Sequence, residues 1–178
     1  MTIVAISGSL RSGSSNAALL QAAADVAPEG MTFVFYEDMG TLPHFNPDLD
    51  GEGAVPPPAV KSFRDLLTAA DGVIICSPEY AHGVPGTLKN ALDWVVSSGE
   101  LTDKPVVQLN ASAAGGQTAQ ASLTGTLKIM GANVLIEASR LAPFIHKKLV
   151  PGTSLDPDTS QALRASLEAF ARAIAAAT

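Results

Sequence analysis

Small polar residues and one arginine crowd the segment that follows the first apolar run of the chain. Gly8 and Gly13 carry no side chain, so the backbone there can turn sharply and come close to a ligand. Hydroxyl donors are available at Ser9, Ser14 and Ser15, and Arg11 adds a planar guanidinium suited to phosphate oxygens. A helix that begins here would direct its free N–H groups and positive dipole end to the same point. The segment therefore favours binding of a dianionic phosphate.

Neither standard glycine-rich phosphate motif accounts for this segment. Leu10 stands where a dinucleotide-binding G-x-G-x-x-G pattern needs its second glycine, and no Gly-Lys-Ser/Thr triplet closes the loop as a P-loop requires. A serine-rich turn is a weak signal by itself. An ordinary strand-to-helix connection therefore stays open as the alternative.

A second candidate segment follows the third apolar run. Pro78 ends the predicted strand, and Pro85 begins the next helix at a position that proline favours. The short loop between them exposes backbone N–H groups and the ring of Tyr80. In doubly wound sheets of flavodoxin-like order, ligands bind between the loops after strands one and three. Both candidate segments follow those two strands, so we expect them to form one site.

The elements that must position these segments alternate along the chain. Apolar, β-branched runs at residues 3–6, 33–36, 73–76, 106–109 and 134–136 are typical of parallel strands buried on both faces. Helical segments are predicted at about 14–26, and by apolar stripes at 60–70, 88–95, 123–130 and 163–174, the last capped by Asp156. The pattern predicts an α/β fold, a doubly wound five-stranded parallel sheet with helices on both faces.

Composition limits the class of protein. With 178 residues, 47% of them hydrophobic, the chain suits a single domain over 1–178. A formal charge of −6 disfavours a nucleic-acid partner, and no run of 18 apolar residues predicts a membrane span. The N-terminus lacks the basic region of a signal peptide, and Cys76 is the single cysteine. We therefore expect a cytoplasmic protein.

Two connections are longer than the fold requires. Residues 37–58 contain several glycines and prolines, and residues 138–154 carry Arg140, His146, Lys147 and Lys148. Connections of that length usually serve a site or an interface. A mobile surface loop is the equally weighted alternative for each of them.

Taken together, the two polar segments resemble the NADPH-dependent FMN reductase family. The resemblance rests on Gly8-Ser9-x-Arg11-x-x-Ser14-x-Asn16 and on Pro78-Glu79-Tyr80, followed by Pro85-Gly86-x-Leu88-Lys89-Asn90-Ala91-x-Asp93-Trp94. It extends to about residue 138. It implies a flavodoxin-like fold and an enzyme that passes electrons from NADPH or NADH through FMN to a small acceptor, such as a quinone, an azo dye, a metal oxyanion or free flavin.

The same resemblance assigns the residues that bind the cofactor. The FMN phosphate would be held by Ser9, Arg11, Ser14, Ser15 and Asn16. The isoalloxazine ring would meet the loop of Pro78, Glu79, Tyr80, Ala81, His82 and Gly83. The segment from Ser112 to Gln117, with Gly115 and Gly116, would close around the ring and the ribityl chain. No catalytic side chain is expected, because FMN carries the redox chemistry. No metal site is expected either, because His44, His82 and His146 lack ligand spacing.

One position departs from the family pattern. Many members carry Asn after the Pro-Glu-Tyr triplet, whereas this chain has Ala81 and then His82. We expect the backbone donors to persist and the polarity near the ring to change. His82 would either donate to the flavin or substrate or remain a solvated loop residue. Glu79 is expected to orient its loop. Trp94 and Cys76 are expected to be core residues, although Trp94 would also suit a subunit interface.

Three functional interpretations follow. In the first, nicotinamide and acceptor use one open flavin face in turn, which predicts ping-pong kinetics. The second is a flavodoxin-type electron carrier acting on protein partners, which Arg11 and the Pro-Glu-Tyr triplet disfavour. The third is a scaffold without flavin. The family also implies a homodimer or homotetramer, and we expect Arg140, Lys147 or Lys148 to favour the extra phosphate of NADPH.

Overall fold

The computed structural model describes residues 1–111, 116–141 and 155–177. None of the helices in that part of the chain is both long and apolar enough to cross a bilayer. The long connection after the second strand contains two short 3-10 turns, Asp38–Thr41 and Pro47–Leu49. The other elements are β1 (Thr2–Ser7), α1 (Ser15–Asp25), β2 (Thr32–Tyr36), α2 (Pro58–Ala69), β3 (Gly72–Cys76), α3 (Gly86–Asp93), β4 (Pro105–Asn110), α4 (Gln117–Ile129), β5 (Asn133–Val134), β6 (Arg140–Leu141) and α5 (Pro157–Ala177).

The strands form a parallel sheet in the order β2-β1-β3-β4-β5, which confirms the predicted doubly wound topology. The fifth strand is shorter than the predicted residues 134–136. β5 pairs only with the start of β4, and β6 pairs with its end, where Leu109 lies opposite Arg140. Between them, the N–H groups of Ala138 and Ser139 donate to the carbonyl of Leu135. This turn splits the edge strand into two short pieces.

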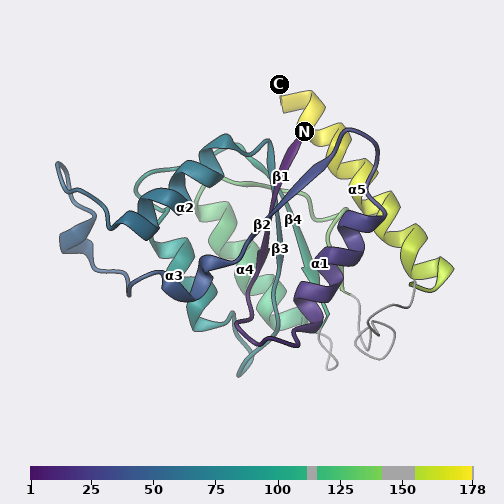
Figure 1. The fold of residues 1–178 in the computed structure, drawn as a ribbon, viewed down its shortest axis with the longest axis horizontal. Coiled ribbons are helices and arrows are strands. Elements are labelled where there is room, and N and C mark those ends of the chain that lie inside the picture. The colour runs from purple at the N-terminus through teal and green to yellow at the C-terminus, as the bar shows by residue number, and fades with distance from the viewer. Residues whose placement is uncertain (112–115, 142–154, 178) are drawn as a thin grey trace.

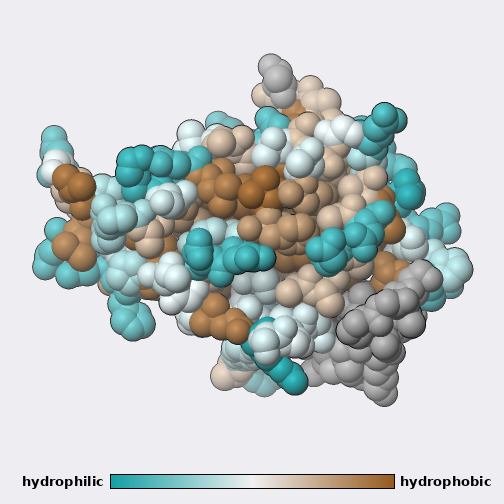
Figure 2. All heavy atoms as spheres, in the orientation of Figure 1, coloured by the Kyte–Doolittle hydropathy of each residue, from teal (hydrophilic) through white to brown (hydrophobic). Residues whose placement is uncertain are grey.

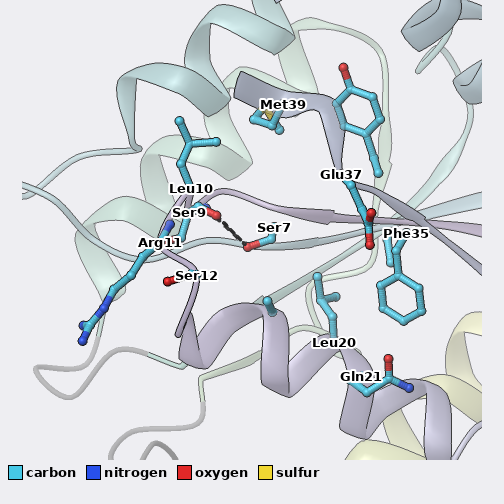
Figure 3. Close-up of a pocket in the computed structure, with 13 residues that line it drawn as sticks. Ser7, Ser9, Leu10, Arg11, Ser12, Leu20, Gln21, Phe35, Glu37 and Met39 are labelled. Carbon is cyan, nitrogen blue, oxygen red and sulfur yellow. Dashed lines mark hydrogen bonds between the residues drawn. The ribbon is translucent and has the colours of Figure 1, made fainter. Parts of the chain in front are cut away.

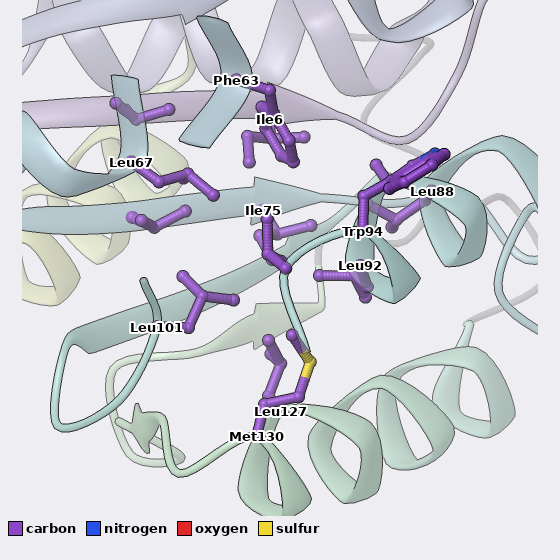
Figure 4. Close-up of a cluster of buried hydrophobic side chains, with 14 of the residues drawn as sticks. Ile6, Phe63, Leu67, Ile75, Leu88, Leu92, Trp94, Leu101, Leu127 and Met130 are labelled. Carbon is purple, nitrogen blue, oxygen red and sulfur yellow. The ribbon is translucent and has the colours of Figure 1, made fainter. Parts of the chain in front are cut away.

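Helices cover both faces of the sheet, as the sequence predicts. α1 and α5 lie on one face, and α2, α3 and α4 lie on the other (Figure 1). Residues of the sheet alternate between two cores: Ile3 packs on the α1 and α5 side, and Ile6 packs with Phe63 and Trp94 on the opposite side (Figure 4). The edge strand β2 is less completely covered, and hydrophobic surface gathers where β2 crosses the face shown in Figure 2.

The long connection after β2 is anchored to α3 through its first part. The indole N–H of Trp94 and the side-chain amide of Asn90 both donate to the carbonyl of Pro43, at 2.8 and 2.9 Å. The Asn90 side-chain oxygen accepts from the Phe45 N–H at 2.8 Å, and the Phe45 ring packs at 81° to the Trp94 ring. Trp94 is fully buried by these contacts, so the expectation of a core residue is confirmed.

The outer part of the connection is fixed by a largely buried ion pair. Arg64 of α2 donates to Asp50 at 2.5 Å and to the carbonyl of Trp94, and the hydroxyl of Ser97 donates to Asp50 at 2.6 Å. Burial opposes ionisation of Asp50, but the hydrogen bonds from Ser97 and Arg64 and the charge of Arg64 outweigh it. The pKa of Asp50 therefore lies below its ordinary value. A connection held in this way is an ordered part of the fold.

The glycine at the start of β3 offers a test of this packing. A Cβ on Gly72 would lie 2.5 Å from the Phe170 ring of α5, whereas a Cβ on Gly125 of α4 would meet no atom within 4 Å. Gly72→Ala should lower the free energy of unfolding by about 1–3 kcal/mol because α5 must shift. Gly125→Ala should raise it by about 0.5–1 kcal/mol through helix propensity. Denaturant titration of both variants measures the difference, and equal effects would contradict the described packing of α5.

Candidate functional site

The loop from β1 to α1 passes very close to the loop after β3. The N–H of Gly8 donates to the carbonyl of Cys76 at 2.9 Å. A Cβ on Gly8 would lie 3.0 Å from the Ser77 hydroxyl oxygen and 3.1 Å from a Leu88 methyl carbon. A glycine is therefore needed at position 8 because the two loops meet there. The sequence pattern had explained this glycine by the close approach of a ligand. A Cβ on Gly13 would meet no atom within 4 Å, so the loop opens at that position.

The beginning of α1 is arranged as an anion site. Ser14 caps the helix, and its hydroxyl oxygen accepts from the N–H of Ala17 at 3.3 Å. Ser9 shapes the preceding turn, because its hydroxyl accepts from the Arg11 N–H at 3.3 Å. The first turn contains no acidic residue, so nothing on the helix offsets its positive end. The Arg11 side chain is exposed beside it.

Asn16 has a structural role that the sequence did not reveal. Its side chain is only 5% exposed, and its oxygen accepts from the Cys76 thiol at 3.2 Å and from the Ala111 N–H at 3.1 Å. These bonds connect α1 to the ends of β3 and β4. Burial raises the pKa of Cys76 well above its ordinary value, so its thiol is a donor in the core and a poor nucleophile.

The loop after β3 forms a two-residue hairpin. The N–H of Tyr80 donates to the Gly83 carbonyl at 3.1 Å, and the N–H of Gly83 donates back at 2.9 Å. Ala81 and His82 both adopt left-handed backbone angles, with φ of 50° and 61°. Such primed turns favour Gly, which has no Cβ, and Asn, whose short polar side chain can hydrogen-bond locally, whereas most other side chains are strained there. The Asn that many family members carry at position 81 therefore suits the backbone itself.

Glu79 joins this hairpin to α4. One carboxylate oxygen accepts from the Ala119 N–H at 2.9 Å, at the positive end of α4, and the other lies 3.5 Å from Nδ1 of His82. The expectation that Glu79 orients its loop is confirmed by these contacts. The His82 side chain is 86% exposed. This exposure supports the solvated alternative for His82, at the turn of the hairpin.

Gly116, just before α4, packs closely against the end of β4. This residue precedes α4 with φ of +80°, and a Cβ on it would lie 2.3 Å from the amide nitrogen of Asn110. The same amide donates to the Ser77 carbonyl at 2.7 Å, which links the ends of β3 and β4. Ser112 and Gly115, predicted to bind the flavin, lie outside the described residues.

A cavity of about 400 Å³ brings the two predicted segments together. The Ser9 and Tyr80 hydroxyls approach to 3.4 Å at its edge, and the Tyr80 ring is 54% exposed. Ala81, His82, Gly83 and Gly116 do not line the cavity. It is lined by Ser9, Arg11, Gly13, Ser14, Ser15, Asn16, Pro78, Glu79, Tyr80 and Ala111.

The donors around this cavity fit FMN. Serine hydroxyls, the uncompensated start of α1 and the Arg11 guanidinium suit a dianionic phosphate. Across the cavity, the exposed ring of Tyr80, with Pro78 and Glu79 before it, suits a flat heterocycle. The open space beside Gly13 leaves room for the phosphate group.

Comparison with known proteins agrees with this arrangement. Residues 1–147 match the family model for NADPH-dependent FMN reductase. The chain belongs to the NADPH-dependent FMN reductase family. It is 31% identical over 176 residues to a quinone reductase of Escherichia coli K12, covering 96% of this chain and 93% of that protein. It is 42% identical over 121 residues to an NAD(P)H-dependent FMN reductase of Pseudomonas aeruginosa, covering 67% of this chain and 64% of that protein.

A solved structure extends the likeness to the fold. The flavoenzyme NAD(P)H:(acceptor) oxidoreductase FerB from Paracoccus denitrificans superposes with a TM-score of 0.85 at 27% identity, over 98% of this chain and 97% of that one. The predicted flavodoxin-like fold, family and enzyme class, an NAD(P)H-dependent oxidoreductase with FMN, are confirmed. The reductase is supported over the flavodoxin-type carrier.

The strained hairpin makes a testable prediction. Ala81→Asn should raise the free energy of unfolding by about 0.5–1 kcal/mol, because Asn tolerates a left-handed backbone better than Ala. Ala81→Val should lower the free energy of unfolding, since a β-branched residue is a true outlier there. Thermal unfolding of both variants provides the measurement. A stabilising Val or a destabilising Asn would contradict the assigned turn.

Proposed function

We propose that this chain acts as a single FMN-binding domain, residues 1–178, that oxidises NADPH or NADH and reduces a small acceptor. The observation that carries the proposal is the shared cavity, in which the Arg11 loop faces the Tyr80 hairpin. A phosphate site alone would suit many ligands. A phosphate site opposite an exposed aromatic ring and a rigid hairpin suits a flavin mononucleotide, because both halves of that molecule find matching groups.

The phosphate half of the site works through charge and backbone donors. Arg11, the hydroxyls of Ser9, Ser14 and Ser15, and the start of α1 would neutralise and orient the phosphate. Asn16 contributes through the NH₂ group of its amide, because its oxygen already accepts two internal hydrogen bonds. This arrangement would anchor one end of the cofactor at the carboxyl end of β1, where the loop into α1 begins.

The ring half of the site works through position. Pro78, Glu79, Tyr80 and the hairpin that Ala81, His82 and Gly83 complete would lie at the ring edge, and Gly116 with Ser112 and Gly115 would bound its other side. FMN, when bound, supplies the hydride chemistry that links a nicotinamide to an acceptor. The protein supplies orientation and a surface from which water is displaced. No side chain is assigned a catalytic proton transfer.

The acceptor is proposed to be a small molecule such as a quinone, an azo dye, a metal oxyanion or free flavin. An open ring face accepts flat, electron-poor compounds in turn with the nicotinamide, which gives ping-pong kinetics. We further propose a cytoplasmic homodimer or homotetramer. The support for the oligomer is the resemblance to the family, which implies a homodimer or homotetramer.

Removal of the guanidinium tests the phosphate site. Arg11→Ala should weaken FMN binding by about 1.5–3 kcal/mol, the scale of a hydrogen bond to a charged group. Arg164→Ala removes an equal charge from an exposed position on α5 and should leave FMN affinity unchanged. Equilibrium dialysis with FMN measures both. Equal affinity of wild type and Arg11→Ala would remove Arg11 from the phosphate site.

Anaerobic titration tests the activity itself. The FMN-loaded protein, mixed with NADPH or NADH and no protein partner, should lose the visible absorbance of oxidised flavin and recover it when a quinone is added. A protein that binds FMN but oxidises neither coenzyme would be an electron carrier. A protein that refuses FMN would be a scaffold.

A further inference from the structure

A second cavity lies on the other side of the β1–α1 loop. It measures about 460 Å³ and opens between β1, β2 and α1, at the carboxyl ends of the two strands. Ser9 and Arg11 line this cavity and the FMN cavity alike, so a single loop separates the two. The family resemblance and the FMN site leave this space unexplained, although its entrance lies beside the proposed phosphate position.

The walls of this second cavity combine a flat aromatic surface with polar groups. Phe35 of β2 is 36% exposed, and Leu10 is 57% exposed at the opposite wall. In Figure 3 the Phe35 ring lies beside Leu20 and Gln21, with the Glu37 carboxylate near it, while the Arg11 side chain extends away on the far side. Exposed aromatic rings flanked by hydrogen-bonding groups suit a flat heterocycle attached to a sugar.

The position of Glu37 indicates what sugar contact is possible. Glu37 directly follows β2 in a β1–α1–β2 unit. In dinucleotide-binding folds, a carboxylate near the end of the corresponding strand accepts hydrogen bonds from the adenosine ribose. This chain lacks the glycine pattern of those folds, but it places a carboxylate at the same topological point beside an exposed aromatic ring.

The charges near Glu37 discriminate between the two nicotinamide coenzymes. Among the described residues that line the cavity, Arg11 is the only cation, and it extends away from Glu37. Asp38, the next residue, adds a second exposed carboxylate. A ribose diol can donate to Glu37, whereas the 2′-phosphate of NADPH would meet like charge without a cation to offset it.

We propose that the cavity between β1, β2 and α1 binds the adenosine half of the nicotinamide coenzyme, with Phe35 against the adenine and Glu37 against the ribose, and that Glu37 favours NADH over NADPH. The inference rests on the proposed reductase function and assigns its coenzyme site. It differs from the expectation that Arg140, Lys147 or Lys148 selects NADPH. Of those three, the structure describes only Arg140, whose guanidinium donates to the Glu137 and Ser139 carbonyls.

Binding of coenzyme fragments to the FMN-loaded protein tests the site without catalysis. Isothermal titration calorimetry should show 5′-AMP binding more tightly than 2′,5′-ADP. Glu37→Gln should weaken the binding of 5′-AMP about tenfold or more, the scale of a hydrogen bond to a charged acceptor. It should also reduce the difference in affinity between 5′-AMP and 2′,5′-ADP. Asp38→Asn removes the same charge one residue away, outside the cavity lining, and should retain most of the 5′-AMP affinity.

Kinetics separate this site from the reductase activity. Phe35→Ala and Glu37→Gln should raise the KM for NADH about tenfold, while the KM for reduced nicotinamide mononucleotide, which has no adenosine, should stay within about twofold. Glu37→Gln should also lower the KM for NADPH. Arg140→Glu should leave the NADPH/NADH preference unchanged if Glu37 sets it.

Distinct outcomes overturn the inference and the function. If the wild type and every variant oxidise NADH as well as they oxidise reduced nicotinamide mononucleotide, the adenosine site is wrong and the reductase function stands. The same holds if the wild type oxidises NADH but does not bind 5′-AMP. If Phe35→Ala changes the oligomeric state of a protein that does not bind 5′-AMP, a second copy covers the groove and the inference is also wrong. If no reduced nicotinamide is oxidised at all, the proposed function fails.

Discussion

The side-chain oxygen of Asn16 fixes the place where three segments meet. It accepts from the Cys76 thiol and from the Ala111 N–H, so the start of α1 is held against the ends of β3 and β4. Because a buried acceptor without partners would cost free energy, these bonds hold the segments in one register. The β1–α1 loop leads into this start of α1, and the Tyr80 hairpin follows β3, so the spacing of the two segments depends on this contact.

Further hydrogen bonds connect the loops at this edge of the sheet to one another. Asn110 bonds to the Ser77 carbonyl and packs under Gly116, while Glu79 caps α4 through Ala119. The Tyr80–Gly83 hairpin keeps its left-handed residues Ala81 and His82 while these contacts hold the segment that leads into it. A cofactor that binds here meets groups already in position, which lowers the entropic cost of binding. The fold therefore provides orientation, the contribution that flavin chemistry requires of a protein.

Strand order, helix faces and the meeting of the two motifs could be predicted from sequence, because buried parallel strands and helical stripes leave clear periodic signals. Backbone conformations that the residue types themselves disfavour could not be predicted from the sequence. Ala81 and His82 are not the Asn and Gly that such turns favour, yet two backbone hydrogen bonds between Tyr80 and Gly83 close them into a primed turn. The role of Asn16 was hidden for a similar reason: a polar residue at a helix start suggests a cap or a ligand contact, and only the sheet's geometry brings Cys76 and Ala111 to it.

The β1–α1 loop separates two cavities whose walls carry opposite charges. On one side, Arg11 and the start of α1 present positive potential without an acidic residue in the first turn. On the other side, Glu37 and Asp38 present negative potential next to the exposed ring of Phe35. An anionic group is therefore drawn to the Arg11 side, and an uncharged sugar with donor hydroxyls is tolerated beside Glu37. One loop thus separates the proposed position of the FMN phosphate from the proposed position of the coenzyme ribose, even though the chain as a whole carries a formal charge of −6.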